Sequence, residues 1–257
     1  MRRFPTLAIA VTIGLIAGCG AGKIREDRAA FDAGYKAFKA GQWLTAVDGF
    51  NRYLRSCPTS PTRGEIYYYR GESLVHLNRR KEAQADFERA LGAKAPEPIL
   101  SFARVATANL YYEDGNDTKA IEKYAEVLRG PTDELPMDMI YLRVGVSLQR
   151  VGRWKDADRY LGRVIERYGD SQAAIEARRR VNGDGFSVQT GAFASPAAAA
   201  QESARLKAAG FQPRVTSLKK GSQSFCAVQV GKAPTYAEAM TLARQVTKAG
   251  FTAMIVP

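Results

Sequence analysis

The stretch GQWLTAVDGFNRYL, residues 41–54, returns in outline as GRWKDADRYLGRVI at residues 152–165. Both stretches begin with a glycine and have an alanine at the sixth position, with apolar side chains four and eight residues after that alanine. Apolar residues with this spacing fall on one face of a helix. The stretch therefore predicts a helix that follows a tight turn and buries one face.

The same unit occurs four times with a period of 37 residues. Its reference alanines are Ala46, Ala83, Ala120 and Ala157. A small residue stands twelve positions before each alanine, where it lets two helices approach closely, and a turn residue stands five positions before it. The turn residues are Gly41, Asn78, Gly115 and Gly152. A repeat of this kind predicts an all-α solenoid of stacked helical hairpins.

The order of small residue, turn glycine, alanine, aromatic and leucine resembles the tetratricopeptide repeat (TPR). The period is longer than the family's usual length of about 34 residues, which predicts longer turns between the repeats. Another helical-hairpin repeat is the alternative, and it would stack in the same way. We expect the repeat domain to cover residues 27–181, with four repeats and a capping helix.

Residues 186–257 contain a second duplication, with an offset of 40 residues. Val188-Gln189-Thr190-Gly191 recurs as Val228-Gln229-Val230-Gly231, and the triplet Ala-Gly-Phe at 209–211 recurs at 249–251. Each copy has the pattern of strand, helix, strand. Two such βαβ units predict a small α/β domain with a four-stranded antiparallel sheet and helices on one face. Residues 182–185 are polar helix breakers and are expected to link the two domains loosely.

The repeated Val-Gln-x-Gly strand ending and Ala-Gly-Phe helix exit resemble the SPOR domain over the whole of residues 186–257. The resemblance implies binding of peptidoglycan glycan strands, with a preference for strands stripped of stem peptides, and accumulation at division septa. An RNA-recognition domain has a similar strand order. It is a poor alternative because the aromatic strand motif that binds RNA is missing.

Strand alternation predicts which side chains lie on the open face of the sheet. If Val188 and Val228 face the helices, their neighbours Gln189 and Gln229 face the open side. Amide groups suit sugar hydroxyls, and glycines permit close approach. The predicted glycan-binding residues are Gln189, Gly191, Phe193, Phe225, Gln229 and Gly231. The alternative is that the two glutamines are simply solvated strand residues.

The first helix of each stacked hairpin lines a concave surface. By resemblance to TPR proteins, this groove is predicted to bind a segment of a protein partner on an aromatic floor. The predicted groove residues are Phe31, Tyr35, Phe38, Tyr68, Glu72, Phe102, Asn109 and Tyr112. The alternative is that the longer repeats rotate some of these side chains into packing between helices.

Residues 1–18 carry two arginines, a short apolar run and small residues before Cys19. This pattern predicts a signal peptide, because the apolar run is too short for a stable transmembrane helix. The end of the run resembles a bacterial lipobox, which implies lipidation of Cys19 and a lipidated linker over 19–26. By resemblance to Gram-negative lipoproteins, Gly20 after the cysteine favours the periplasmic face of the outer membrane.

The composition narrows the classes of function. A formal net charge of +12 favours anionic partners. With one histidine, His76, and no CxxC pair, the chain lacks the ligands of multi-histidine or zinc-ribbon sites, so no metal or cofactor is expected. Cys57 and Cys226 either form a disulfide in an oxidising compartment or stay as free thiols.

Together these features predict a non-enzymatic outer-membrane lipoprotein. It would bind peptidoglycan glycan strands and an envelope protein, but no nucleic acid, in cell-envelope organisation or cell division. One alternative is an accessory TPR lipoprotein of outer-membrane protein assembly or envelope transport. A peptidoglycan hydrolase is a weaker alternative, because the repeats and the C-terminal domain leave no sequence for a catalytic domain.

Overall fold

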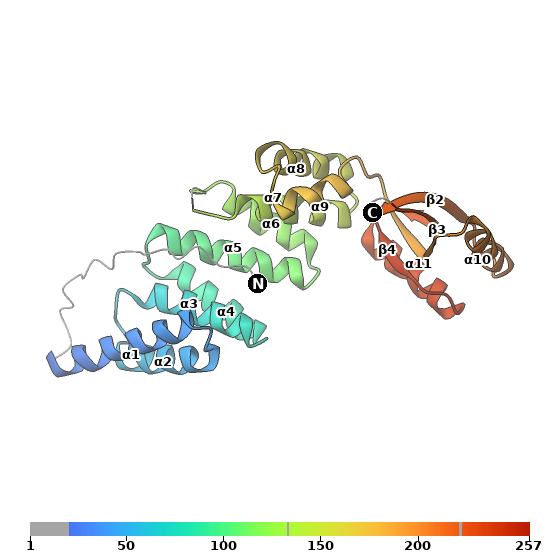
Figure 1. Cartoon of the computed structure of the whole chain (residues 1–257). Helices are drawn as coiled ribbons and strands as arrows, with labels where there is room; N and C mark the ends of the chain where they lie inside the picture. The colour runs from blue at the N-terminus through green and yellow to red at the C-terminus, as the bar shows by residue number, and fades with distance from the viewer. Residues whose placement is uncertain (1–20, 133, 221–222) are drawn as a thin grey trace. The chain divides into compact units, whose positions relative to one another are not determined.

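The chain is described by a computed structural model over residues 21–132, 134–220 and 223–257 (Figure 1). In these ranges, helices α1 to α9 come first and are followed by the order β1-α10-β2-β3-α11-β4. The chain divides into two compact units, one ending at Ala103 and one running from Arg104 to Pro257. The fold class predicted from the sequence, helical hairpins followed by a small α/β domain, is confirmed.

The first unit consists of two helical hairpins and the start of a third. Its helices are α1 (Ala21–Lys39), α2 (Trp43–Ser56), α3 (Arg63–His76), α4 (Arg80–Gly92) and the first part of α5 (Glu97–Glu113). Helix α1 packs against α2, α3 packs against α4, and α2 packs against α3. Consecutive hairpins therefore stack, as a solenoid requires.

The second unit contains the rest of α5 and the remaining helices of the repeat region. These helices are α6 (Asp117–Val127), α7 (Met137–Arg150), α8 (Trp154–Arg167) and α9 (Gln172–Arg180). Helix α7 packs against α8, and both pack against α9. Helix α9 thus covers the last hairpin, at the position where the sequence predicts a capping helix.

The turn inside each hairpin has the geometry that its sequence predicts. The backbone φ is +70° at Gly41, +58° at Asn78, +71° at Gly115 and +82° at Gly152. This left-handed region is open to glycine and tolerated by asparagine, which explains the residue types at these positions. Each reference alanine is the fourth residue of the next helix, and all four are fully buried.

The small residue in the first helix of a hairpin makes room for the large side chain in the second. A Cβ atom added at Gly71 would lie 2.6 Å from Cε1 of Phe87. A Cβ atom added at Gly145 would lie 2.7 Å from Cδ2 of Leu161. Real Cβ atoms do not approach other atoms so closely, so these glycines set the spacing of the paired helices.

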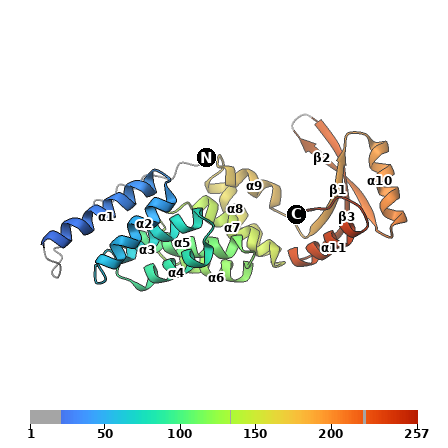
Figure 2. The same ribbon diagram turned by 90° about the horizontal axis from the view of Figure 1, so that it is seen from below.

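The C-terminal domain is a four-stranded antiparallel sheet with the strand order β2-β3-β1-β4 (Figure 2). Its elements are β1 (Phe186–Phe193), α10 (Pro196–Ala208), β2 (Pro213–Lys220), β3 (Gln223–Ala233), α11 (Tyr236–Lys248) and β4 (Met254–Val256). Strand β1 lies between β3 and β4, so the two central strands are the ones that carry the duplicated Val-Gln motif.

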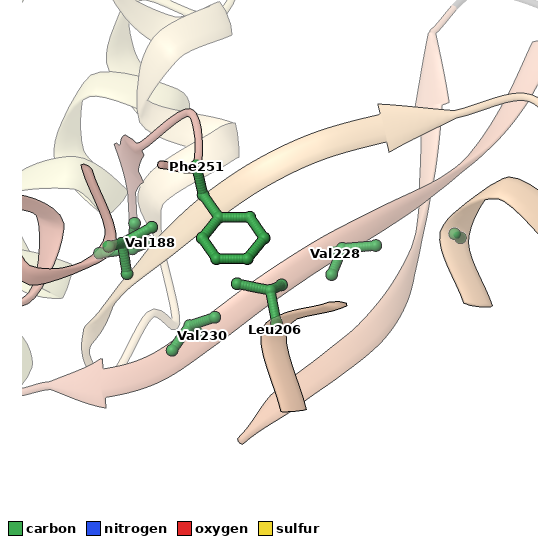
Figure 3. Packing of buried hydrophobic residues seen from close by; sticks show 7 residues of the cluster. Val188, Leu206, Val228, Val230 and Phe251 are labelled. Carbon is green, nitrogen blue, oxygen red and sulfur yellow. The ribbon is translucent and has the colours of Figure 1, made fainter. Parts of the chain in front are cut away.

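One face of this sheet is covered by α10 and α11. Val188 of β1 and Val228 of β3 are fully buried and pack with Leu206 of α10 and Val246 of α11 (Figure 3). Phe251, in the segment that leads to β4, joins the same cluster. Fully burying a side chain of this size contributes about 2 kcal/mol, so this cluster stabilises the packing of both helices on the sheet.

The last hairpin of the repeat region and the sheet share a smaller buried cluster. Trp154 at the start of α8 packs with Phe186 of β1 and with Ala233 and Ala239. The expectation of loosely linked domains is therefore wrong for this part of the chain. The linker segment contributes as well, because Asp184 forms an ion pair with Lys232 of β3.

The last two features of the fold are the character of its helices and the burial of its cysteines. Among the described residues, no helix combines the length and the apolar character needed to cross a membrane. Cys57 is buried and Cys226 is half-buried.

Candidate functional site

The second face of the sheet carries no helix and is the candidate ligand surface. Directly opposed residues of antiparallel strands lie on the same face. Gln189 of β1 is opposite Gln229 of β3 and Met254 of β4, and Gln229 is opposite Arg214 of β2. One row of side chains therefore runs across all four strands on the face away from Val188. We call this row, Arg214, Gln229, Gln189 and Met254, the cross-strand row.

The members of the cross-strand row differ in their exposure to solvent. Met254 is 53% exposed and Arg214 is exposed, whereas Gln229 is half-buried. Gln189 lies on the predicted face but is only 8% exposed. Of the two predicted glutamines, Gln229 is the more accessible to a ligand.

Arg214 was not among the residues selected from the sequence. Its Nε donates a hydrogen bond to Oε1 of Gln229 over 3.3 Å, and its Nη2 donates one to Oγ of Ser187 over 2.5 Å. Ser187 is 2% exposed and lies on β1. The guanidinium thus spans three strands on the open face. Alternation along β2 could have placed Arg214 there once the pairing with β3 was known.

Phe225 lies on the open face, as predicted. It is half-buried and opposite Leu218 of β2, which is 42% exposed. Between this pair and the cross-strand row lies Ala227, opposite Thr216. The open face therefore offers polar hydrogen-bonding groups at one level and an apolar patch four residues further along the strands, a combination that suits a sugar with polar edges and apolar faces.

Phe193 does not join the open face. Gln189 pairs with Gln229 and Gly191 pairs with the adjacent Val228, so Thr190 is an extra residue and forms a β-bulge. The bulge moves Gly191 and Phe193 to the helix-covered side, where Phe193 packs against the core cluster. Its phenyl ring lies over Gly191, since a Cβ atom there would be 2.6 Å from Cζ of Phe193.

Gly231 also has a structural reason for its residue type. Its φ is +66°, which disfavours any side chain. A Cβ atom at this position would lie 2.4 Å from Cδ2 of Leu242 in α11. Both predicted glycines are thus required by the local packing of the domain, whether or not a ligand approaches them.

The predicted groove of the first unit is an aromatic cluster. Phe31, Tyr35 and Phe38 follow one another along α1, with successive ring centroids 5.8 Å and 6.3 Å apart. Tyr69 of α3 lies 5.0 Å from Tyr35 and 5.1 Å from Phe38. All four rings are half-buried and pack against the same core, so they form a floor with one side accessible. Tyr69, unlike Tyr68, was not predicted from the sequence to line the groove.

Tyr68 and Phe102 continue this aromatic surface along α3 and α5. Their ring centroids are 6.2 Å apart, and Tyr68 also lies 6.3 Å from Phe87. Burial raises the pKa of Tyr68 well above its ordinary value, and the nearby charge of Glu72 adds to the shift. Tyr68 therefore helps to hold α3 and α4 together, and Glu72 is half-buried beside it.

Two predicted groove residues lie in the second unit. Asn109 accepts a hydrogen bond from the hydroxyl of Tyr124 over 2.5 Å, which ties α5 to α6. Tyr112 lies between two guanidinium groups, with Arg143 5.1 Å and Arg150 4.9 Å from its ring centroid. Each guanidinium also has a carboxylate partner, Glu113 for Arg143 and Asp117 for Arg150, so the surface around Tyr112 combines an aromatic ring with paired charges.

The predicted signal peptide and lipidation site cannot be placed on this structure. Cys19 and the predicted signal peptide, 1–18, lie outside the described residues. In the part of the chain that the structure describes, no group of three or more His, Cys, Asp or Glu side chains could hold a metal ion.

Comparison with known proteins agrees with this architecture. Residues 182–257 match the SPOR domain family, and residues 140–171 match a tetratricopeptide repeat. No curated protein matches the chain by sequence. Among solved structures, the chain is similar to MamA from AMB-1, with 16% identity and a TM-score of 0.51 over 62% of this chain and 80% of that one.

A tetratricopeptide repeat protein from Parabacteroides merdae ATCC 43184 is similar to the same degree, with 18% identity and a TM-score of 0.51. The likeness covers 60% of this chain and 58% of that one. At such identities the two structures support the fold alone. The family matches go further, since SPOR domains bind peptidoglycan and tetratricopeptide repeats bind proteins. The chain therefore carries a tetratricopeptide repeat at residues 140–171 and a SPOR domain at residues 182–257, and both are kinds of binding module.

Proposed function

We propose that the protein is a non-enzymatic adaptor of the bacterial cell envelope. Its SPOR domain holds peptidoglycan glycan strands on the open face of the sheet, and its repeat region holds a segment of a partner protein. A lipid on Cys19 anchors the chain at the periplasmic face of the outer membrane. The adaptor serves envelope organisation or cell division by linking the membrane, the wall and the partner.

The observation that carries the glycan assignment is the cross-strand row. Gln229 offers a side-chain amide on a face that no helix covers, and the mostly buried Gln189 lies directly opposite it. Arg214 adds unused guanidinium donors beside them. The apolar pair Phe225 and Leu218 lies further along the same face, where a sugar ring can pack.

The glycan assignment is tested with purified sacculi and the full chain carrying Cys19→Ser, which keeps it free of lipid. We expect the protein to sediment with sacculi. Gln229→Ala should lower the retained fraction about threefold to tenfold, since it removes one or two hydrogen bonds. Gln201→Ala, an equivalent change on the exposed side of α10, is the matched control. Equal retention of the two variants would exclude the open face as the contact surface.

The groove assignment rests on the aromatic surfaces around Tyr35 and Tyr112. A photo-crosslinking amino acid placed at Tyr112 should give discrete adducts with an envelope protein in living cells. The same amino acid at Glu122, an exposed position on α6, should give none of these adducts. Identical adduct patterns at the two positions would place the partner outside the groove.

The anchoring assignment rests on the apolar run and small residues before Cys19. Cells supplied with a labelled fatty acid should label the wild-type chain and not the Cys19→Ser variant. Density fractionation should then move the chain from outer-membrane fractions to the soluble periplasm. Label in the variant would show that Cys19 is not the acceptor.

A further inference from the structure

Arg214 is a cation held in place by neutral groups. Its two hydrogen-bond partners, Gln229 and Ser187, carry no charge. Among the described residues, Arg214 forms no ion pair within 4.0 Å. A guanidinium has five N–H donors, so most of those on Arg214 are still available. Surface arginines of this chain are otherwise commonly paired, as Arg205 is with Glu202.

Asp184, an acid whose charge interacts with Arg214, has another partner. Asp184 in the linker forms its ion pair with Lys232, and the hydrogen bond from Lys232 is the main reason that the pKa of Asp184 is lowered. Arg214 contributes to that lowering only through a weaker charge interaction. The domain therefore does not neutralise Arg214 by itself.

The position of the guanidinium is fixed before any ligand arrives. Ser187 is almost fully buried, and Gln229 belongs to the central strand β3, so neither partner can follow Arg214 if it moves. A pre-organised guanidinium loses little freedom when it binds a planar anion. A carboxylate is the anion that matches its fork, because two parallel hydrogen bonds can form.

We propose that Arg214 is a specificity-determining residue that binds a carboxylate group of peptidoglycan; this inference rests on the proposed glycan-binding function. Peptidoglycan has two kinds of carboxylate that Arg214 could bind. One is the lactyl carboxylate of muramic acid, which is free only where the stem peptide has been removed. The other is a carboxylate of the stem peptide itself. In the first case Arg214 selects stripped glycan, and in the second it selects intact glycan.

The experiment compares three probes with the full chain carrying Cys19→Ser: untreated sacculi, amidase-treated sacculi, and amidase-treated sacculi whose carboxylates have been converted to methylamides. If Arg214 binds the lactyl carboxylate, amidase treatment strengthens binding and methylamide conversion weakens it about tenfold. If Arg214 binds a stem-peptide carboxylate, amidase treatment itself weakens binding. In both cases Arg214→Gln should bind all three probes with the same reduced affinity.

Arg244→Gln is the matched control, because Arg244 is exposed on α11 at the other side of the sheet. It should retain the full discrimination of the wild type. Arg214→Lys keeps the positive charge but lacks the paired, planar N–H donors of a guanidinium. Its discrimination between carboxylate and methylamide should fall between that of the wild type and that of Arg214→Gln. Thermal unfolding of each variant checks that the domain is folded.

The inference is overturned if Arg214→Gln still distinguishes carboxylate from methylamide as strongly as the wild type. It is also overturned if Arg244→Gln loses as much discrimination as Arg214→Gln, since the effect would then come from net charge. A wild-type chain that binds none of the three probes would instead overturn the proposed function, so the two failures can be told apart.

Discussion

The indole N–H of Trp154 donates a hydrogen bond to the backbone carbonyl of Pro234, with 2.8 Å between Nε1 and O. The two residues are 80 positions apart and join the start of α8 to the turn between β3 and α11. The indole also lies 4.9 Å from the ring of Phe186 and is 8% exposed. Thr235 packs closely against Gly152, just before α8: a Cβ atom added at Gly152 would lie 3.2 Å from Cγ2 of Thr235. The start of α8 in the last repeat therefore packs directly against the SPOR domain.

This contact predicts that the last repeat and the SPOR domain unfold together. Trp154→Ala removes a buried ring and a hydrogen bond, and we expect a loss of about 3 kcal/mol or more in the free energy of unfolding. Calorimetry should show the SPOR domain of this variant melting as a separate transition. Trypsin should also cut the variant faster within residues 178–184.

Trp154→Phe is the informative companion variant. It keeps most of the apolar contact with Phe186 but removes the donor to Pro234, so we expect a loss of about 1 kcal/mol. A Trp154→Ala chain that melts in the same transition as the wild type, with no added proteolysis, would show that the contact does not couple the two parts.

The helical repeat could be predicted from the sequence because its determinants are local. A residue such as Gly41 or Asn78 permits a left-handed turn wherever it stands, and an alanine five residues later marks the buried face. The close approach of Gly71 and Phe87 follows from the same fixed spacing. These features need no knowledge of distant parts of the chain.

The open face of the sheet could be predicted only in part. Alternation from Val188 correctly placed Gln189, and alternation from Val228 correctly placed Gln229 and Phe225. The β-bulge at Thr190 then reversed the faces, so Phe193 lies among the core residues. A bulge depends on how two strands pair, and a single strand's sequence does not contain that information.

The tertiary contacts of the groove and of Trp154 were beyond sequence reasoning for a different reason. Spacing places Asn109 on the inner face of its helix, but the hydrogen bond from Tyr124 depends on how two helices cross. The contact of Trp154 with Pro234 joins two domains and has no local signature at all.

The second prediction concerns Gly231 in β3. Gly231→Ala forces a side chain into a left-handed conformation and against Leu242, and we expect it to cost about 2 kcal/mol of stability. Gly162→Ala on α8 is the control, since its Cβ would meet nothing within 4 Å and alanine favours a helix. Urea unfolding of both variants measures the difference. If Gly231→Ala is as stable as the wild type but no longer binds sacculi, the glycine serves the ligand rather than the fold.

The third prediction concerns the buried carboxylate of Asp86 in α4. Its two oxygens accept hydrogen bonds from Nε and Nη2 of Arg70, each over 2.6 Å, and Arg70 also donates to Asn51 of α2. Asp86→Asn would leave the mostly buried Arg70 without its counter-charge. We expect a loss of about 3 kcal/mol or more, measured by urea unfolding.

Arg89 provides the contrast for this prediction. It also contacts Asp86, over 2.9 Å, but its side chain is 56% exposed. Arg89→Gln should cost less than about 1 kcal/mol, because water solvates an exposed ion pair. Equal losses for Asp86→Asn and Arg89→Gln would mean that burial of Arg70 does not set the strength of this contact.

The last prediction concerns pH and the only histidine. The imidazole of His76 stacks on Trp43, with ring centroids 3.9 Å apart and planes 4° apart. Burial in this stack lowers the pKa of His76 below its ordinary value of 6.5. The unfolded chain therefore takes up a proton at a higher pH than the folded chain does. The free energy of unfolding should fall as the pH drops through 6.5 toward the folded-state pKa.

His76→Gln isolates this contribution, because glutamine does not titrate. Urea unfolding of both chains between about pH 7 and pH 5 should show a steeper loss of stability in the wild type. Glu65, whose pKa is raised by burial, acts at lower pH and in the opposite direction, and it is present in both chains. The difference between the two curves therefore reports His76 alone. Parallel curves over this range would mean that stacking on Trp43 does not disfavour the protonated imidazole.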